Sequence, residues 1–315
     1  MKDPGELLAT VERSGFTESV HLGHAVLIDP DGSVIESWGS PAEPFFPRSA
    51  NKPLQVAGLV DAGLTLTGRQ LAIAAGSHNG EAFHLSTVRE ILAEGGLTEE
   101  DLENTPALPV GHEALLAWVR SGGGDASLTQ NCSGKHAAML RTAQVLGAPT
   151  RGYRDPEHPV QRAALAGIES LTGESPTAIG VDGCGAPVAA ISLVGLARAY
   201  SRMVRSSPES AAGQVAAAMS AHPEYVAGTG RDVTAFMRAL PGAIAKDGAE
   251  SVSAFALPDG RAGAVKISDG GERARPAAVI GLLDRLGVPE DVLAAAAPAP
   301  VLGGGRPVGA VLPAF

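Results

Sequence analysis

The chain has 315 residues, 44% of them hydrophobic, which is enough to bury a large core in one or two domains. Its net charge of −10 argues against nucleic acid and membrane surfaces as partners, because those are bound by clustered lysine and arginine. A small-molecule partner is therefore favoured. The first residues lack the pattern of a secretory signal, and no stretch of about 18 apolar residues occurs, so we expect a cytoplasmic protein.

In chain order, the first predicted element is a β-hairpin over 24–39, where apolar and polar residues alternate around a D-P-D-G turn. A second hairpin, over 251–268, repeats this design around P-D-G. Helical periodicity between the two hairpins predicts helices over 53–62, 68–75, 83–95, 134–146, 158–171, 187–204, 208–220 and 231–239. Two more helices, over 275–287 and 289–297, and a last strand within 305–313 follow.

This order predicts an α/β (α+β) fold with a mainly antiparallel sheet built from N- and C-terminal hairpins. Helices cover the sheet and also form a helical subdomain. We interpret residues 1–315 as a single catalytic unit, with its sheet part at about 16–48 and 241–315 and its mainly helical part at about 49–240.

Lysine is scarce in this chain: only five of the 24 basic residues are lysine. Lysine can lose its proton when it is buried or lies near another charge, whereas arginine in effect cannot, so a lysine can mark a chemical requirement. Lys2 and Lys246 have polar, turn-like neighbours and are predicted to be surface residues. The other three, Lys52, Lys135 and Lys266, lie in compact motifs beside Ser, Gly or Cys.

The motif "RSANKPLQ" places Ser49 and Lys52 three residues apart at a predicted helix start. On such a turn the amine can accept the serine proton while helix N–H groups face a developing anion, which would make Ser49 an activated nucleophile. The alternative is that Ser49 or Asn51 caps the helix and that Lys52 is solvated.

Two further motifs carry hydroxyl and amine groups. "GSHNGE" contains Ser77, His78 and Asn79; Ser77 could relay a proton and Asn79 could bind a substrate carbonyl, or the motif is a helix end followed by a turn. "VKISDGG" puts Lys266 and Ser268 on one face of a strand, where Lys266 is either part of a site or an exposed strand lysine. The order of the three motifs is similar to that of serine β-lactamases and penicillin-binding proteins, although K-T-G is missing from the third.

Both cysteines lie in glycine-flanked turns that open helices, "NCSGKHAAML" and "GVDGCGAP". Cys132 and Lys135 would share one side of a first turn, and Cys184 could complete a three-ligand zinc site with water in the fourth position. The alternatives are two buried thiols, a disulfide, or a redox pair activated by Lys135. His136 and Asp182 adjoin the same turns and are candidates for supporting or substrate-binding groups.

Together with "HP" and "HPEYVAGTGR", these motifs resemble, in order from about residue 12 to 285, the Rhizobium-type L-asparaginase family, also called asparaginase II. The resemblance implies a fold similar to serine β-lactamases and glutaminases, a homodimer, and hydrolysis of L-asparagine to L-aspartate and ammonia. It also implies two Ser-Lys tandems, Ser49 with Lys52 and Ser77 with Lys266, and one zinc ion per chain.

On this interpretation the zinc ligands are Cys132, Lys135 and Cys184, and the candidate substrate-binding residues are Arg48, His78, Asn79, His136 and Asp182. Which of Ser49 and Ser77 is acylated stays open. Competing functions are a β-lactamase-like amidase, esterase or glutaminase, and a zinc- or redox-responsive binding protein that uses the two cysteines.

Overall fold

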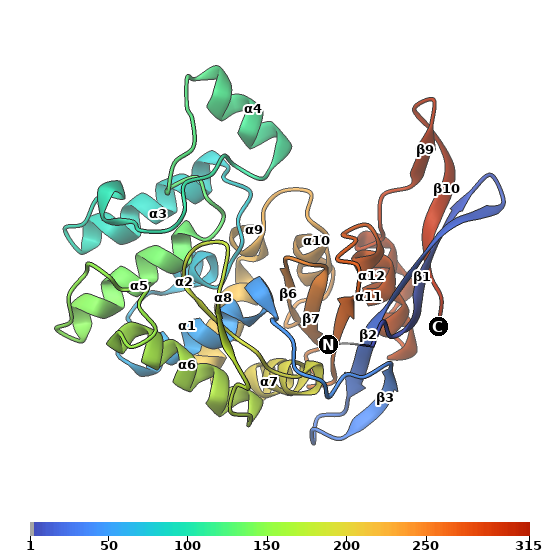
Figure 1. Cartoon of the computed structure of the whole chain (residues 1–315), viewed down its shortest axis with the longest axis horizontal. Coiled ribbons are helices and arrows are strands. Elements are labelled where there is room, and N and C mark those ends of the chain that lie inside the picture. The colour runs from blue at the N-terminus through green and yellow to red at the C-terminus, as the bar shows by residue number, and fades with distance from the viewer. Residues whose placement is uncertain (1–2) are drawn as a thin grey trace.

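The computed structural model describes residues 3–315 and contains one eight-stranded antiparallel sheet flanked by a large helical part (Figure 1). The strands run in the order β6-β7-β8-β2-β1-β10-β9, and β3 pairs with β2. These strands span Glu6–Arg13 (β1), Phe16–Ile28 (β2), Val34–Trp38 (β3), Ile244–Gly248 (β6), Val252–Ala256 (β7), Ala262–Ile267 (β8), Val301–Gly303 (β9) and Arg306–Pro313 (β10). A separate ribbon pairs Ile179–Val181 (β4) with Pro187–Ala189 (β5).

The helices lie mostly between β3 and β6 in the sequence. The α-helices span Lys52–Asp61 (α1), Gly68–Ala74 (α2), Ala82–Glu94 (α3), His112–Arg120 (α4), Ser133–Val145 (α5), Pro159–Thr172 (α6), Leu193–Arg205 (α7), Ala211–Ala221 (α8), Pro223–Val226 (α9), Asp232–Ala239 (α10), Ala274–Arg285 (α11) and Glu290–Ala295 (α12). The 3₁₀ helices are Arg48–Asn51 (η1) and Glu99–Asp101 (η2). None of the helices within residues 3–315 is long and apolar enough to cross a membrane.

The predicted fold class is confirmed, because the sheet is built from both ends of the chain. Both predicted hairpins are present, as β2–β3 and β7–β8. The end of β2 is buried at every position from 23 to 28, and successive side chains point to opposite faces, so both faces of the sheet are covered there. Helix α7 packs on β2, β7 and β8, and α11 packs on β1, β8 and β10.

Two sequence predictions about elements need correction. The helix predicted over 187–204 begins only at Leu193, because the Ser192 hydroxyl caps it by accepting from the Gly195 N–H, and residues 187–189 form β5 instead. The sheet also begins earlier than residue 16, since β1 lies between β2 and β10. The assignment of the whole chain to one catalytic unit stays a prediction.

Helix α1 is the centre of the helical part and packs against α5, α6 and α8. Its contact with α6 is very close: a Cβ added at Gly58 would lie 2.1 Å from the Ala163 carbonyl oxygen. Helix propensity alone would favour alanine at Gly58 by about 1 kcal/mol. The steric clash with backbone outweighs this preference and fixes glycine at the crossing.

We therefore expect Gly58→Ala to lower the free energy of unfolding by about 3 kcal/mol, the upper range for overpacking. Gly124→Ala is the matched control, because a Cβ at Gly124 meets no atom within 4 Å. Urea unfolding followed by circular dichroism measures both variants. A Gly58→Ala protein as stable as the control would contradict the close packing of α1 on α6.

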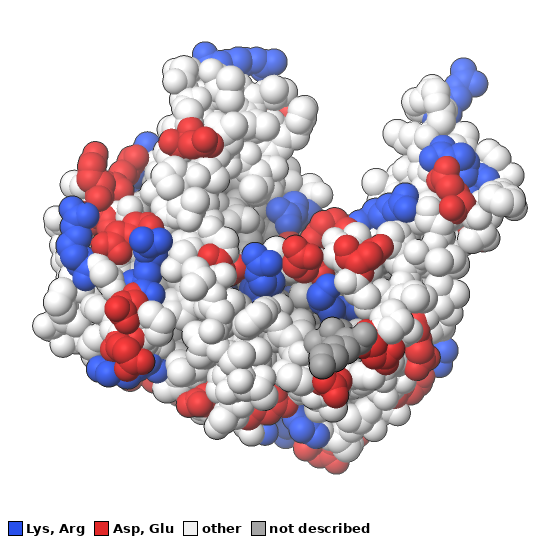
Figure 2. Space-filling model, in the orientation of Figure 1, with Lys and Arg blue, Asp and Glu red and all other residues white. Residues whose placement is uncertain are grey.

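The molecule has two projecting parts, the α4 segment and an arm made of the β1–β2 and β9–β10 ends (Figure 1). The space-filling view shows the surface hollowed between them, with basic and acidic side chains side by side at the base (Figure 2). The mixed charge fits the expectation of a small polar partner better than that of a polyanion.

Candidate active site

The first motif forms the turn that leads into α1. Ser49 lies in η1 and is partly exposed, whereas Lys52 is the first residue of α1 and is completely buried. Asn51 is the N-cap residue of α1, as the alternative interpretation allowed, but no side-chain capping hydrogen bond occurs at the start of η1 or α1. The other part of that alternative, a solvated Lys52, is wrong. Arg48, directly before Ser49, has φ of 51°, a left-handed conformation that is unfavourable for a residue with a side chain.

Lys52 connects the first motif to the second. Its Nζ donates to the Gly76 carbonyl oxygen at 2.6 Å and to Ser77 Oγ at 2.9 Å. Because the amine is fully buried, these two acceptors hold it in a fixed direction. No hydrogen bond of the Ser49 side chain occurs within residues 3–315, so the contact in this structure joins Lys52 to Ser77.

Lys246 was predicted to be a surface residue, and this is wrong: its side chain is completely buried. It lies on β6, which packs against η1, α8 and α10, so its polar sequence neighbours are covered by distant elements. A Cβ at Gly248 would lie 2.6 Å from the Pro47 carbonyl oxygen and 3.3 Å from the Ser49 nitrogen, which places the end of β6 directly beside the turn of Ser49. Lys2, the other predicted surface lysine, lies outside the described residues.

The Lys246 amine is held in a charged cluster. It donates to Asp247 Oδ1 at 2.6 Å, and Asp247 Oδ2 accepts from Arg231 Nη2, also at 2.6 Å. Burial lowers the pKa of Lys246 to about 8, and the positive charge of Lys52 adds to this effect, while Asp247 opposes it. A lysine with this pKa is partly neutral near physiological pH, as a proton acceptor must be.

The position of Lys266 differs from that expected of a partner of Ser77. Its Nζ donates to the carbonyl oxygens of Glu250, at 2.7 Å, and of Ile267. Within residues 3–315 no hydrogen bond joins Lys266 to Ser77, so the predicted second tandem is absent as a bonded pair. Glu250 lies in the turn between β6 and β7 with φ of 63°, and Lys266 thus ties down the turn that follows Lys246.

The two cysteine motifs come together as predicted. Cys132 and Cys184 are free, buried, and packed with Ala186, and Lys135 Nζ lies 3.6 Å from Cys184 Sγ. A hydrogen bond from the Cys184 thiol lowers the pKa of Cys132 well below its usual range, and Lys52 and Lys135 lower it further. The hydrogen bond to Cys132 raises the pKa of Cys184, and burial of Cys184 raises it further, so Cys132 is the more acidic thiol of the pair.

The donor atoms of this cluster fit zinc in their chemistry, since two sulfurs and one amine converge in a buried place. Within residues 3–315 no group of three or more His, Cys, Asp or Glu side chains could hold a metal ion. The predicted set depends on Lys135 as its third ligand. Burial acts to lower the pKa of Lys135, but Cys184, Cys132 and the Asp182 carboxylate outweigh it and raise the pKa, so metal binding would have to displace a proton from this amine.

Arg48 and Asp182, two candidate substrate-binding residues, pair with each other. Arg48 Nε donates to Asp182 Oδ1 at 2.7 Å, which joins the Ser49 turn to the loop that carries Cys184. Burial of Asp182 acts to raise its pKa, but the hydrogen bond from Arg48 and the charge of Lys135 outweigh it and lower the pKa. The pair therefore stays charged at the junction of both motifs.

His136 has one free nitrogen. Tyr153 Oη accepts from the Glu103 N–H at 3.0 Å and lies 2.8 Å from His136 Nδ1. His136 Nε2 is buried and has no partner among residues 3–315. This nitrogen is therefore open to one hydrogen bond with a bound group.

His78 and Asn79 are already paired with protein groups. His78 Nε2 lies 2.8 Å from Ser133 Oγ, and its Nδ1 accepts from the Gly80 N–H. Both N–H groups of the Asn79 amide are used, by Glu81 and by the Thr229 carbonyl, and Arg231 donates to its oxygen. In this arrangement both residues support the loops around Ser77, and their predicted contact with substrate stays a prediction.

Sequence reasoning missed Lys246, Asp247 and Arg231. A signal was present in the K-x-G spacing of Lys246 and Gly248, which is the spacing sought in the third motif and found incomplete at Lys266. No comparable local signal marks Arg231, because it reaches Asp247 and Asn79 from a different loop.

Comparison with known proteins adds the family. Residues 9–313 match the family described as L-asparaginase II. No curated protein matches the sequence. Among solved structures, a β-lactamase from Mycobacterium bovis is 16% identical over 84% of this chain and 94% of that chain, with a TM-score of 0.44. A putative β-lactamase from Bacteroides dorei is 15% identical over 83% and 93%, also with a TM-score of 0.44. Because the family match spans nearly the whole sequence, the chain belongs to the L-asparaginase II family.

Proposed function

We propose that this chain is an L-asparaginase that hydrolyses L-asparagine to L-aspartate and ammonia through a serine activated by lysine. The family assignment supports an amidohydrolase of the asparaginase type. The observation that supports the Ser-Lys chemistry is the 2.9 Å hydrogen bond from the buried Lys52 amine to Ser77 Oγ. Lys52 itself lies about one helical turn after Ser49 in the sequence.

In the proposed reaction a serine Oγ attacks the side-chain amide carbon of asparagine, and its proton passes to a neutral lysine amine. The tetrahedral oxyanion would be stabilised by backbone N–H groups at the start of η1 and α1. Return of the proton to the amide nitrogen releases ammonia and leaves an acyl-enzyme, which water then hydrolyses. Ser49 is the favoured nucleophile because it is partly exposed, and Ser77 would relay the proton through Lys52.

Lys246 is proposed as the second amine of the site, in the role that the resemblance gave to Lys266. It lies on the strand beside the Ser49 turn and is completely buried, and the positive charge of Lys52 lowers its pKa. Two protonated lysines close together repel each other, which favours loss of a proton from one of them, and the neutral amine can act as a base. Lys266 supports the adjoining turn through the Glu250 carbonyl.

Protonation of Lys246 gives the proposal a pH dependence. A base acts only when it is neutral, so kcat/KM should fall as pH decreases through the Lys246 pKa of about 8. In Lys246→Met this step should disappear from the pH–rate profile. A profile with the same step in the variant would assign the titration to another group.

Zinc binding by Cys132, Lys135 and Cys184 is also proposed. Bound there, the ion would act as a Lewis acid that orients the polar end of the substrate. Elemental analysis of the purified protein should find about one zinc per chain, and Cys132→Ala should lose it. If metal-free wild-type protein is incubated with excess zinc and then contains no bound ion, this part of the proposal is overturned.

Substrate class is tested by measuring ammonia release from L-asparagine and L-glutamine, and turnover of a simple ester. The proposal predicts a kcat/KM for asparagine at least about tenfold above that for glutamine, since one methylene typically changes discrimination by 10–200-fold. Preferred turnover of the ester or of glutamine would identify the chain as a different amidase or esterase. The homodimer and the cytoplasmic location remain predictions from the sequence.

A further inference from the structure

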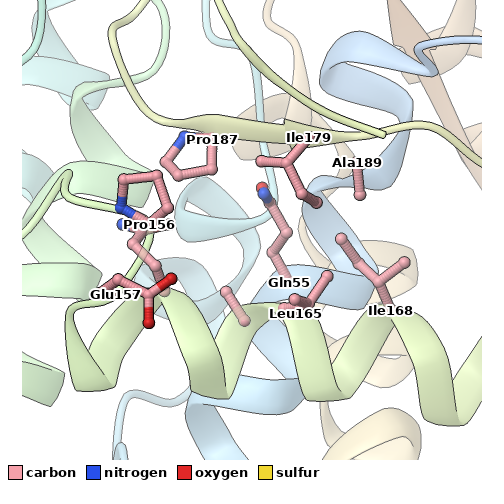
Figure 3. A pocket seen from close by; sticks show the side chains of 10 residues that line it. Gln55, Pro156, Glu157, Leu165, Ile168, Ile179, Pro187 and Ala189 are labelled. Atoms are coloured by element: carbon pink, nitrogen blue, oxygen red, sulfur yellow. The ribbon is translucent and has the colours of Figure 1, made fainter. Parts of the chain in front are cut away.

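A small pocket lies between α1, α6 and the β4–β5 ribbon (Figure 3). Its cavity volume is about 100 Å³. None of the candidate catalytic, substrate or zinc residues lines it. The pocket therefore needs an explanation separate from the proposed hydrolysis.

The walls of this pocket are mostly apolar. Leu165 and Ile168 come from α6, Ile179 from β4 and Ala189 from β5 (Figure 3). The pocket opens to solvent beside the exposed residue Glu157, and its apolar walls suit a small apolar group. A branched alkyl group of three or four carbons would match these walls.

Gln55 is the exception among the lining residues. Its side chain extends from α1 toward the β4–β5 ribbon, and the residue is only 3% exposed (Figure 3). The Oε1 atom is buried without a partner, and no hydrogen bond of the Gln55 amide is found within residues 3–315. Buried polar groups are nearly always paired, so an unpaired amide facing a cavity indicates a missing partner.

We propose that this pocket binds a small aliphatic primary amide. Such a ligand donates an N–H to Gln55 Oε1 and offers its own carbonyl to the Gln55 NH₂, so both halves of the buried amide are satisfied at once. Its alkyl group contacts the apolar walls. Glu157, also a lining residue, is exposed, and its negative charge disfavours carboxylates at the same place.

The proposal can be tested with isobutyramide, which has a branched alkyl body and a primary amide. It is titrated into the full chain carrying Ser49→Ala, and methyl signals of Leu165, Ile168 and Ile179 are followed by NMR. Isobutyronitrile is the control ligand, because it keeps the alkyl body but has no N–H. Gln55→Leu is the control variant, because it keeps the volume and removes the amide.

The expected result is saturable shifts of these methyl signals with a millimolar Kd for isobutyramide. Binding should weaken at least about tenfold in Gln55→Leu and for the nitrile, as expected for loss of hydrogen bonds to buried groups. The proposal would be overturned in favour of an unspecific apolar cavity by either of two results. One is equal affinity for isobutyramide and isobutyronitrile, and the other is equal affinity of the proteins with Gln55 and with Gln55→Leu for isobutyramide. Absence of saturable shifts at these methyls would overturn it in favour of water as the partner of Gln55.

A second variant keeps the test decisive if Gln55→Leu fails to fold. Leu165 is only partly buried at the pocket, so Leu165→Phe adds volume from its edge. Isobutyramide binding, followed at Ile168 and Ile179, should then weaken at least about tenfold. Undiminished binding in Leu165→Phe would place the amide outside this pocket.

Discussion

Lys52→Met is expected to lower kcat for ammonia release from L-asparagine by about 10³-fold, within the range for loss of a general base. Lys52 is completely buried, and its amine is the group that contacts Ser77 Oγ. Methionine has a similar length and no charge, so the helix start should keep its packing. Steady-state ammonia release and the melting temperature together separate a chemical effect from unfolding.

Lys52→Arg is the matched variant for this prediction. It keeps a positive charge but cannot supply a neutral amine, so it should be nearly as inactive as Lys52→Met. If Lys52→Arg retained more than about a tenth of wild-type activity, Lys52 would act through its charge and not as a base.

The second large effect is expected at Lys246, where Lys246→Met should lower kcat by about 10²-fold or more. Lys246→Arg should not restore activity, because arginine stays protonated. At Lys266 the expectation is opposite: Lys266→Met should lose activity modestly through disorder of the β6–β7 turn. Lys266→Arg should restore it, because a guanidinium can also donate to the Glu250 carbonyl.

This pair of lysines distinguishes the structural assignment from the one expected from the sequence. If Lys266→Arg were as inactive as Lys266→Met while Lys246→Arg stayed active, Lys266 would be the second base. Melting temperatures of all four variants show whether each substitution acts on folding, since Lys246 also pairs with buried Asp247.

Much of the architecture could be predicted because its signals are local. Alternation around D-P-D-G and P-D-G identified the two hairpins, and Ser49, Lys52, Cys132 and Lys135 mark helix starts through their neighbours. The helix that begins at Leu193 is predicted too early, from residue 187. The apolar run continues across Ser192, so the pattern alone does not reveal that Ser192 caps the helix. Strand β1 was missed since Glu, Thr and Arg interrupt its apolar residues.

The K-x-G spacing is the one local signal that favours Lys246 over Lys266, and the other residues around Lys246 contradict it. The residues around Lys246, "AIAKDGAES", are typical of an exposed turn, yet η1, α8 and α10 bury this strand. The contact with η1 joins residues about 200 positions apart, from 48–51 to β6 at 244–248. The alternation that placed Lys266 on a strand was right, but it carries no information about which turn its amine reaches.

The most direct test of the proposed function is ammonia release from L-asparagine by the wild-type chain and by Ser49→Ala, prepared and assayed together. We predict saturable turnover by the wild type and a loss of at least about 10³-fold in Ser49→Ala, with an unchanged melting temperature. A wild-type protein that releases no ammonia from asparagine, or a Ser49→Ala variant that works at the wild-type rate, would contradict it.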